Sequence, residues 1–346
     1  MHTRPNPVSP EESAALLADP PRLYARWRAL LAEHHHLHGP EAAALLGVPE
    51  ASLLASATGR GNRPLAGALT DILAPAAGWG RVLLAARNAL GVHLNVMAQA
   101  CVEATPGGLQ LSGEQHEIRL ATRGIARIDL FEENDAHGRT LSLNWFDAAG
   151  HAIGRLFLMS KEGREVAGPH LAGFEQAQSG DRWTPGVVEL PPLLLLERAT
   201  DWRELAQPAQ GPMPDRSAWA TAAILCCDHP GGMELSMAGP GVAAVYRGPL
   251  GKVSHTPPAA HATDLLCKLH ARPGVATAVH AFGEHGLSVR SADGGELRLQ
   301  PLGADVETWR ERVLRRAQAL TPPNTTADPA AVAAATDAAE AGGAHR

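Results

Sequence analysis

Apolar and polar residues alternate along the middle of the chain, and the pattern is clearest between residues 81 and 97. A short apolar run, Val82–Ala86, precedes two polar residues, Arg87 and Asn88, and then the alternating segment Val92–Val96. A period of two predicts β-strands that bury one face, and a short polar connection between them predicts a hairpin. Further strands are predicted at residues 116–120, 125–131, 140–146 and 152–158, with a turn at 147–150, and together they form an antiparallel meander.

Two segments of this strand region recur in the second half in the same order. Residues 85–96 align with residues 226–237, and residues 143–150 align with residues 287–294. Each match has few identities, but two matches in order indicate a diverged duplication. The strand pattern repeats over Ala220–Leu299, which predicts a second antiparallel sheet.

Apolar residues at helical spacing predict helices around these strands. The predicted helices are Pro20–Ala32, Pro40–Leu46, Pro49–Ala55, Leu65–Ala74, Lys161–Gln176, Leu195–Ala206 and Asp305–Leu320. We therefore expect an α+β protein with two unequal tandem repeats, each an antiparallel β-sheet with attached helices. The expected organisation is a disordered lead-in at 1–11, a first repeat with N-terminal helices at 12–178, a linker with one short helix at 179–217, a truncated second repeat at 218–320 and a disordered tail at 321–346.

Composition and charge narrow the function classes. The net charge of −6 argues against a dedicated nucleic-acid binder, because phosphate binding depends on clustered Lys and Arg. A helix-turn-helix outline at Pro40–Ala55 has no basic recognition helix. The cysteines lack CxxC spacing, and neither a signal segment nor a membrane-spanning apolar run is present. We expect a cytoplasmic protein that binds no nucleic acid and inserts into no membrane. No phosphate loop, nucleophile elbow or paired carboxylates indicate a catalytic site.

Several segments resemble those of a known family. Arg87-Asn88 followed by Val92-His93 resembles RNE-x-x-VH, Glu117–Leu120 stands where the family has Asp-Leu-Arg, and Leu141–Gly150 resembles S-x-Q-F-F-D-x-x-G. The family is the bacterial hemin-degrading/hemin-transport family of the HemS/ChuS/HmuS type, related to the shorter ChuX/HutX proteins. The likeness covers about residues 20–178 and, more weakly, 218–320. It implies tandem repeats of an antiparallel sheet with helices, and heme as a ligand that is handled in the cytoplasm after import.

The resemblance also implies heme-binding residues. Arg119 stands at the family's opposing arginine, and Lys268 takes the corresponding place in the second half. Arg87 is a further cation for the propionates, since arginine binds carboxylates bidentately. The family's iron-binding histidine has no counterpart here, because its position falls on Arg203 or is deleted. We therefore expect His93 to bind the iron, the other candidates being His116, His229, Cys226 and Cys227.

Each candidate also has a purely structural interpretation. Arg119 suits a solvated strand, Arg87 suits a salt bridge at a strand end, and His93 suits a buried position satisfied by a backbone carbonyl. Two clusters have two interpretations in the same way. The cluster His34, His35, His36 and His38 is either a metal site or an exposed polar link. The segment Cys226-Cys227-Asp228-His229 either binds heme or a metal or belongs to the core.

The sequence thus predicts a heme-binding protein of heme uptake and iron acquisition. Carriage ranks above enzymatic degradation because the usual histidine is missing. The partners left open are a heme-import ATPase, a heme-degrading oxygenase and a second copy of the chain. The alternative is a diverged interaction or regulatory protein that keeps the fold but no longer binds heme.

Overall fold

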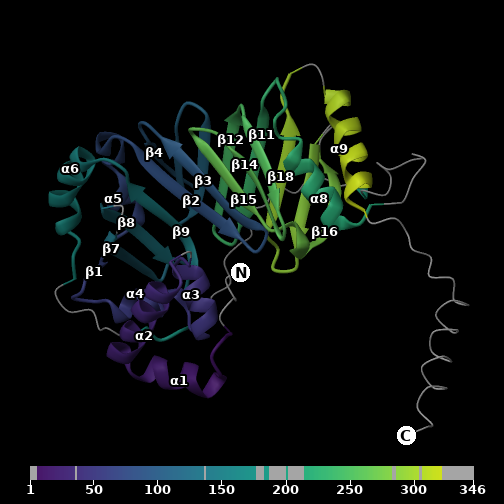
Figure 1. Cartoon of the computed structure of the whole chain (residues 1–346). Coiled ribbons are helices and arrows are strands. Elements are labelled where there is room, and N and C mark those ends of the chain that lie inside the picture. Colours follow the sequence, from purple (N-terminus) through teal and green to yellow (C-terminus); the bar gives the residue numbers. More distant parts are fainter. Residues whose placement is uncertain are drawn as a thin grey trace, which may run out of the picture.

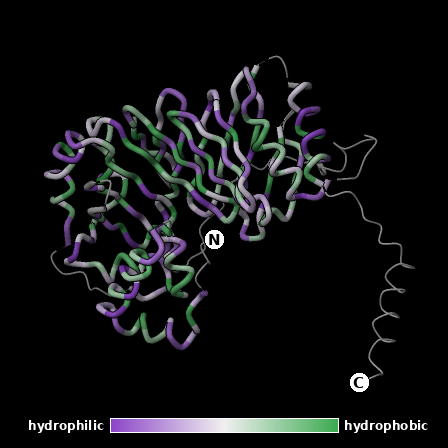
Figure 2. The backbone as a smooth tube through the Cα atoms, in the orientation of Figure 1, coloured by the Kyte–Doolittle hydropathy of each residue, from purple (hydrophilic) through white to green (hydrophobic). Residues whose placement is uncertain are grey.

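The computed structural model describes residues 6–35, 37–135, 138–176, 183–186, 200–201, 214–282, 286–303 and 306–321. Two antiparallel β-sheets pack face to face, and helices lie at both ends of the sandwich (Figure 1). Hydrophobic and hydrophilic residues alternate along the strands (Figure 2), as the period of two predicts. Among the described helices, none combines the length and apolarity needed to cross a membrane.

Both sheets contain nine strands in the described part of the chain. The first sheet has the order β1 (Asn62–Leu65), β7 (Arg127–Asp135), β8 (Gly138–Phe146), β9 (Ala152–Leu158), β2 (Val82–Asn88), β3 (Gly91–Met97), β15 (Cys267–Ala271), β14 (Ala259–Thr263) and β13 (Lys252–Thr256). The second sheet has the order β10 (Thr200–Asp201), β16 (Ala276–Phe282), β17 (Gly286–Ser291), β18 (Glu296–Pro301), β11 (Met233–Gly239), β12 (Val242–Gly248), β6 (His116–Ala121), β5 (Gly108–Ser112) and β4 (Cys101–Thr105).

The two strand orders repeat each other, which confirms the tandem repeats that the sequence predicts, but the repeats exchange strands. β13–β15 from the second half continue the first sheet beyond β3, and β4–β6 from the first half continue the second sheet beyond β12. Neither half therefore completes its own sheet. The exchange places residues from both halves of the chain on each sheet face.

The strand order also corrects one of the two sequence alignments. The hairpin β2–β3 closes at Asn88 opposite Gly91, and the equivalent hairpin β11–β12 closes at Gly239 opposite Val242. Gly91 therefore corresponds to Val242, whereas the alignment had placed it on Gly232 and β3 on β11. The second alignment holds, because the turns after β8 and β17 both end in a glycine of positive φ, at residues 150 and 294.

Helices cover the sheets in three groups, and each group closes a hydrophobic core. The N-terminal group packs on the outer face of β7 and β8, the second group covers the inner face near β9, and the third covers the inner face of the second sheet. The N-terminal group consists of α1 (Pro10–Ala18), α2 (Pro20–Glu33), α3 (Gly39–Leu46) and α4 (Glu50–Ser56). The second group consists of α5 (Leu69–Leu73), the 3-10 turn η1 (Ala76–Trp79) and α6 (Lys161–Ala172). The third group consists of α8 (Arg216–Leu225), the 3-10 turn η2 (Pro273–Val275) and α9 (Val306–Leu320).

Two helices differ from the sequence prediction. α1 begins inside the segment expected to be disordered, because the Ser9 hydroxyl accepts a hydrogen bond from the Glu12 N–H at 3.2 Å and caps the helix. α8 occupies part of the segment assigned to strands, since its residues are buried nearly all round and show no helical stripe. The helix expected at Leu195–Ala206 lies mostly outside the described residues, and Thr200–Asp201 form β10 instead. The tail from residue 322 onward also lies outside them.

The strand exchange makes a direct prediction for the isolated first half, residues 1–186. Its β3 and β6 would both lose their partners, β15 and β12, and expose long unpaired edges. We expect this fragment to form a dimer in which β4–β6 of each copy pair with β3 of the other. Light scattering after size exclusion should therefore give twice the fragment mass, and a folded monomer would contradict the prediction.

Candidate functional site

Arg119 lies on the outer face of the second sheet, the face turned away from the sandwich core. Its side chain is 56% exposed and pairs with Glu117 on the same strand. It borders a small hollow of about 110 Å³ formed by side chains of β18, β11, β12 and β6. The apolar part of its lining consists of Met237, Ala238, Ala243 and Val245. An exposed arginine beside a small apolar surface suits the carboxylate end of an amphipathic ligand.

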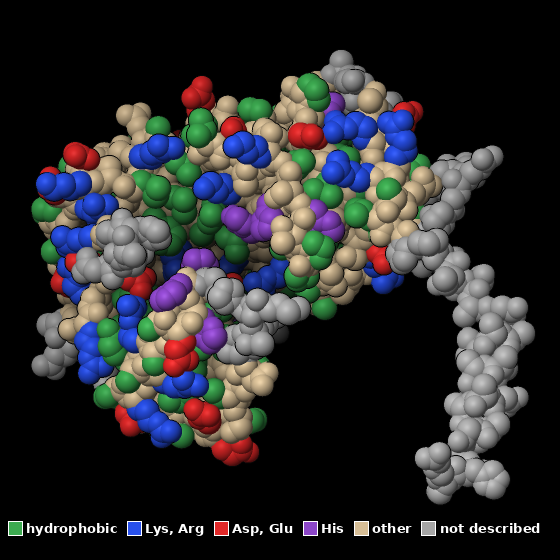
Figure 3. Space-filling model, viewed as in Figure 1, with side chains coloured by type: hydrophobic (Ala, Val, Ile, Leu, Met, Phe, Trp, Pro, Cys, Tyr) green, Lys and Arg blue, Asp and Glu red, His purple; other side chains and the backbone are tan. Residues whose placement is uncertain are grey.

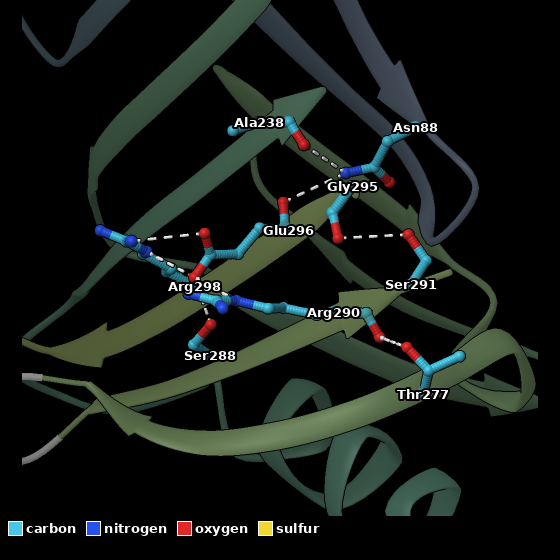
Figure 4. A network of polar contacts seen from close by, with 9 residues as sticks. All are labelled: Asn88, Ala238, Thr277, Ser288, Arg290, Ser291, Gly295, Glu296 and Arg298. Carbon is cyan, nitrogen blue, oxygen red and sulfur yellow. Dashed lines mark hydrogen bonds and ion pairs between the residues drawn. The ribbon is translucent and has the colours of Figure 1, made fainter. Parts of the chain in front are cut away.

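The rest of this face is polar, and its charges are largely paired. The Arg247 Nε donates to Glu234 at 2.6 Å, and the buried Arg298 Nε donates to Glu296 at 2.8 Å. Figure 4 shows Glu296 at the centre of a network that also takes in Ser288 and Arg290. The ion pairs leave Arg119 as the most exposed arginine among the described residues that line the hollow.

The segment that resembles the family's iron-binding region meets the edge of this same sheet. Thr200 and Asp201 pair with Ala281 and His280 of β16, and the residues after Asp201 are not described. His280 itself lies on the outer face, because it pairs with Ser288, which pairs with Arg298. Sequence reasoning had not selected it. Five strand spacings, about 24 Å, separate β16 from β6, so His280 cannot meet Arg119 across one small ligand.

The outer face of the first sheet has a different character. Apolar side chains stand side by side where the strands pair, with Leu83 between Phe157 and the buried Val96 and with Ala85 beside Leu94; all but Val96 are half-buried. Val92 extends the strip toward β15. Figure 3 shows hydrophobic side chains gathered in a hollow over β2 and β3, with histidines on both sides of it. We call these residues the apolar strip: Leu83, Ala85, Val92, Leu94, Val96 and Phe157.

One end of the apolar strip is closed by a charge cluster that ties α3 and α4 to the sheet. The buried Glu50 of α4 accepts from both Arg87 and Arg155, the latter at 2.9 Å. Burial lowers the pKa of Arg87 and of Arg155 to about 10, because a guanidinium loses hydration there. Glu41 of α3 pairs with Arg272 at 3.2 Å. Arg87 thus forms a structural salt bridge, which is one of the two roles that the sequence suggests for it, and it lies at the border of an open apolar surface.

The other border of the apolar strip carries two histidines and a lysine. His270 pairs with Val92 on one side and with His261 on the other, and the two Nδ1 atoms lie 2.8 Å apart. Burial and the neighbouring His261 lower the pKa of His270, which favours its neutral imidazole. Lys268 is exposed on the same strand and face. The strand correspondence places His270, and not Lys268, at the position equivalent to Arg119, so that part of the sequence assignment is wrong.

The position of His93 argues against its expected role as an iron ligand. Its side chain is fully buried between the sheets, on the face of β3 opposite Val92 and Leu94. Its Nε2 lies 3.2 Å from the Cys267 Sγ, and burial lowers its pKa to about 3. β3 is moreover in the first sheet and Arg119 is in the second, so the two residues share no surface.

The remaining candidates are also buried. His116 lies at the same interface, with its Nε2 3.1 Å from the Leu266 carbonyl oxygen. His229 is buried, and Cys226 and Cys227 lie in the core at the end of α8. Burial raises the pKa of the Cys227 thiol, which disfavours the thiolate that would bind a metal. Within the described residues, no group of three or more His, Cys, Asp or Glu side chains is arranged to hold a metal ion.

Comparisons with known proteins agree with this architecture. The model of the haemin-degrading HemS.ChuX domain matches residues 47–176. The structure resembles holo-PhuS, a heme-binding protein from Pseudomonas aeruginosa, with a TM-score of 0.69 and 18% identity over 85% of this chain and 98% of PhuS. It also resembles the heme-degrading enzyme ChuS from Escherichia coli O157:H7, with a TM-score of 0.66 and 17% identity over 86% of this chain and 99% of ChuS. No protein with a curated description matches significantly.

The matched segment begins just before α4, ends just after α6 and contains β1–β9. Arg87, His93 and Arg119 lie within it, and Lys268 lies in the second repeat. The likeness to PhuS and ChuS, at these low identities, shows that the whole two-repeat fold is shared. Residues 47–176 therefore match the haemin-degrading HemS.ChuX domain, and the chain shares the two-repeat fold of PhuS and ChuS.

Proposed function

We propose that this protein binds heme and carries it in the cytoplasm during heme uptake and iron acquisition. The observation that carries the proposal is Arg119, which stands exposed beside a hollow at the position where the family has its arginine. A heme site needs apolar walls, a cation for the propionates and a donor for the iron. The outer face of the second sheet fits the first two needs through Ala243, Val245 and Arg119.

The need for an iron donor favours carriage of heme over its degradation. The sequence has no histidine between His170 and His229, so the linker cannot supply the family's iron ligand. His280, the histidine described on this face, is too far from Arg119 to serve the same heme. A weakly held iron suits transfer to another protein. The partner classes that this role implies are a heme-import ATPase as the source and a heme-degrading oxygenase as the recipient.

We predict that Arg119→Ala weakens hemin binding about 10- to 100-fold, because a charge-assisted contact to a carboxylate contributes about 1.5–3 kcal/mol. The melting temperature should stay the same, since exposed ion pairs contribute little to folding. Soret titration and thermal melting measure the two quantities. Lys161→Ala, at an exposed position of α6, is the control that should change neither.

The alternative is an interaction or regulatory protein that has lost heme. It would be favoured by a wild-type titration in which the spectrum stays that of free hemin. Equal affinities of the wild type and Arg119→Ala would instead keep heme binding and remove Arg119 from the site.

A further inference from the structure

We propose that the outer face of the first sheet is a second binding site for a heme-type ligand, a flat apolar ring with carboxylate groups, and that His270 donates to its metal. The ligand class rests on the proposed function, but the residues are separate from those around Arg119. Three independent features of the face support the assignment: its apolar floor, its excess of positive charge and its paired imidazoles.

The floor is the apolar strip. Its members come from β9, β2 and β3, three adjacent strands, and all point outward from the sandwich. In the second sheet the equivalents of Leu83, Ala85 and Val96 are the polar residues Glu234, Ser236 and Arg247, while those of Val92 and Leu94 stay apolar, so the first face is the more apolar of the two. An open apolar surface loses contact with water when a flat ring covers it, which stabilises the bound state.

The charges at the border favour an anion. Arg87, Arg155 and Arg272 face two carboxylates, those of Glu41 and Glu50. Glu133 also acts on Arg155 but is paired with Arg28, so the three guanidiniums and two carboxylates leave one positive charge unbalanced within this cluster. The exposed Lys268 adds another beside the strip. Carboxylates bound there would gain charge-assisted hydrogen bonds where the local dielectric is low.

The imidazole pair supplies a metal donor. His270 and His261 approach through their Nδ1 atoms, so one Nδ1–H donates to the other ring. When His270 is the donor, its Nε2 is unprotonated and carries the lone pair that a metal needs. A metal-binding histidine commonly donates its other N–H to a neighbouring acceptor, which fixes the ring. His261 therefore acts as a positioning residue for His270.

The test is hemin titration of the full-length protein, followed by Soret absorbance and by electron paramagnetic resonance of the ferric iron. The wild type should bind two equivalents, one with a histidine-type signature. His270→Ala should lose that equivalent and that signature, while its melting temperature stays unchanged because the side chain is exposed. His255→Ala is the matched control, since His255 is exposed on β13 of the same sheet, and its neighbour Ser254 is the residue that pairs with His261.

The outcomes separate this proposal from the proposed function. One equivalent in the wild type, insensitive to His270→Ala and weakened by Arg119→Ala, would overturn the second site and leave heme binding intact. One equivalent that depends on His270 and not on Arg119 would support the second site and remove the first. No hemin binding by the wild type would overturn both. Metal-free protoporphyrin gives a further check, because His270→Ala should leave its binding nearly unchanged.

Discussion

Acidification from pH 7 to pH 4 should lower the free energy of unfolding by about 3 kcal/mol through His93 alone. The buried imidazole has a pKa of about 3, lowered from 6.5 first by burial and then by the nearby His116. Above pH 6.5 the residue is neutral in both states. Below that pH the unfolded chain takes up a proton that the folded protein does not, so stability is lost as the pH falls toward 3.

Denaturant unfolding at several pH values measures this effect. His93→Leu should flatten the dependence between pH 6.5 and pH 4, whatever it does to stability at pH 7. His255→Leu removes an exposed histidine and serves as the control that should keep the wild-type slope. A His93→Leu slope equal to that of the wild type would show that other groups govern the acid response.

Glu50→Ala should destabilise the protein by about 3–5 kcal/mol, because it leaves two partly buried guanidiniums without their shared carboxylate. Arg87→Ala should cost less, since Arg155 and Glu50 then remain paired. The ion pair also joins α4 to the first sheet, so the loss should loosen the N-terminal helices. Thermal melting and denaturant titration measure the change.

Glu41→Ala is the matched control for Glu50. Its carboxylate pairs with Arg272, whose side chain is 56% exposed, so its loss should cost less than about 1 kcal/mol. If Glu41→Ala and Glu50→Ala lowered the free energy of unfolding equally, the buried ion pairs of Glu50 would contribute no more to stability than the exposed pair of Glu41, which would contradict the prediction.

The local elements of this fold could be predicted from sequence, whereas the pairing of the two halves could not. The hairpin at residues 82–96 and the turn before β9 follow from alternation and turn residues. The strand exchange depends on which edges meet, and a period of two carries no information about the partner strand. The same ambiguity displaced one repeat alignment by a strand, because β3 and β11 show equally regular alternation.

The candidate site shows the same limit. Alternation correctly separated His93 from Val92 and Leu94, but it could not tell which of the two faces is buried. Only the pairing of β15 with β3 and β14 brings His270 beside His261 and the apolar strip. These histidines are nine residues apart on different strands, and no short motif links them. Arg119 could be found because it lies within a segment that resembles the family.

Hemin titration of the wild-type protein tests the central claim most directly. The account predicts a Soret band that shifts on binding and saturates at a fixed number of equivalents, with quenching of tryptophan fluorescence at the same points. A spectrum that remains the sum of free hemin and unliganded protein at every ratio would contradict it.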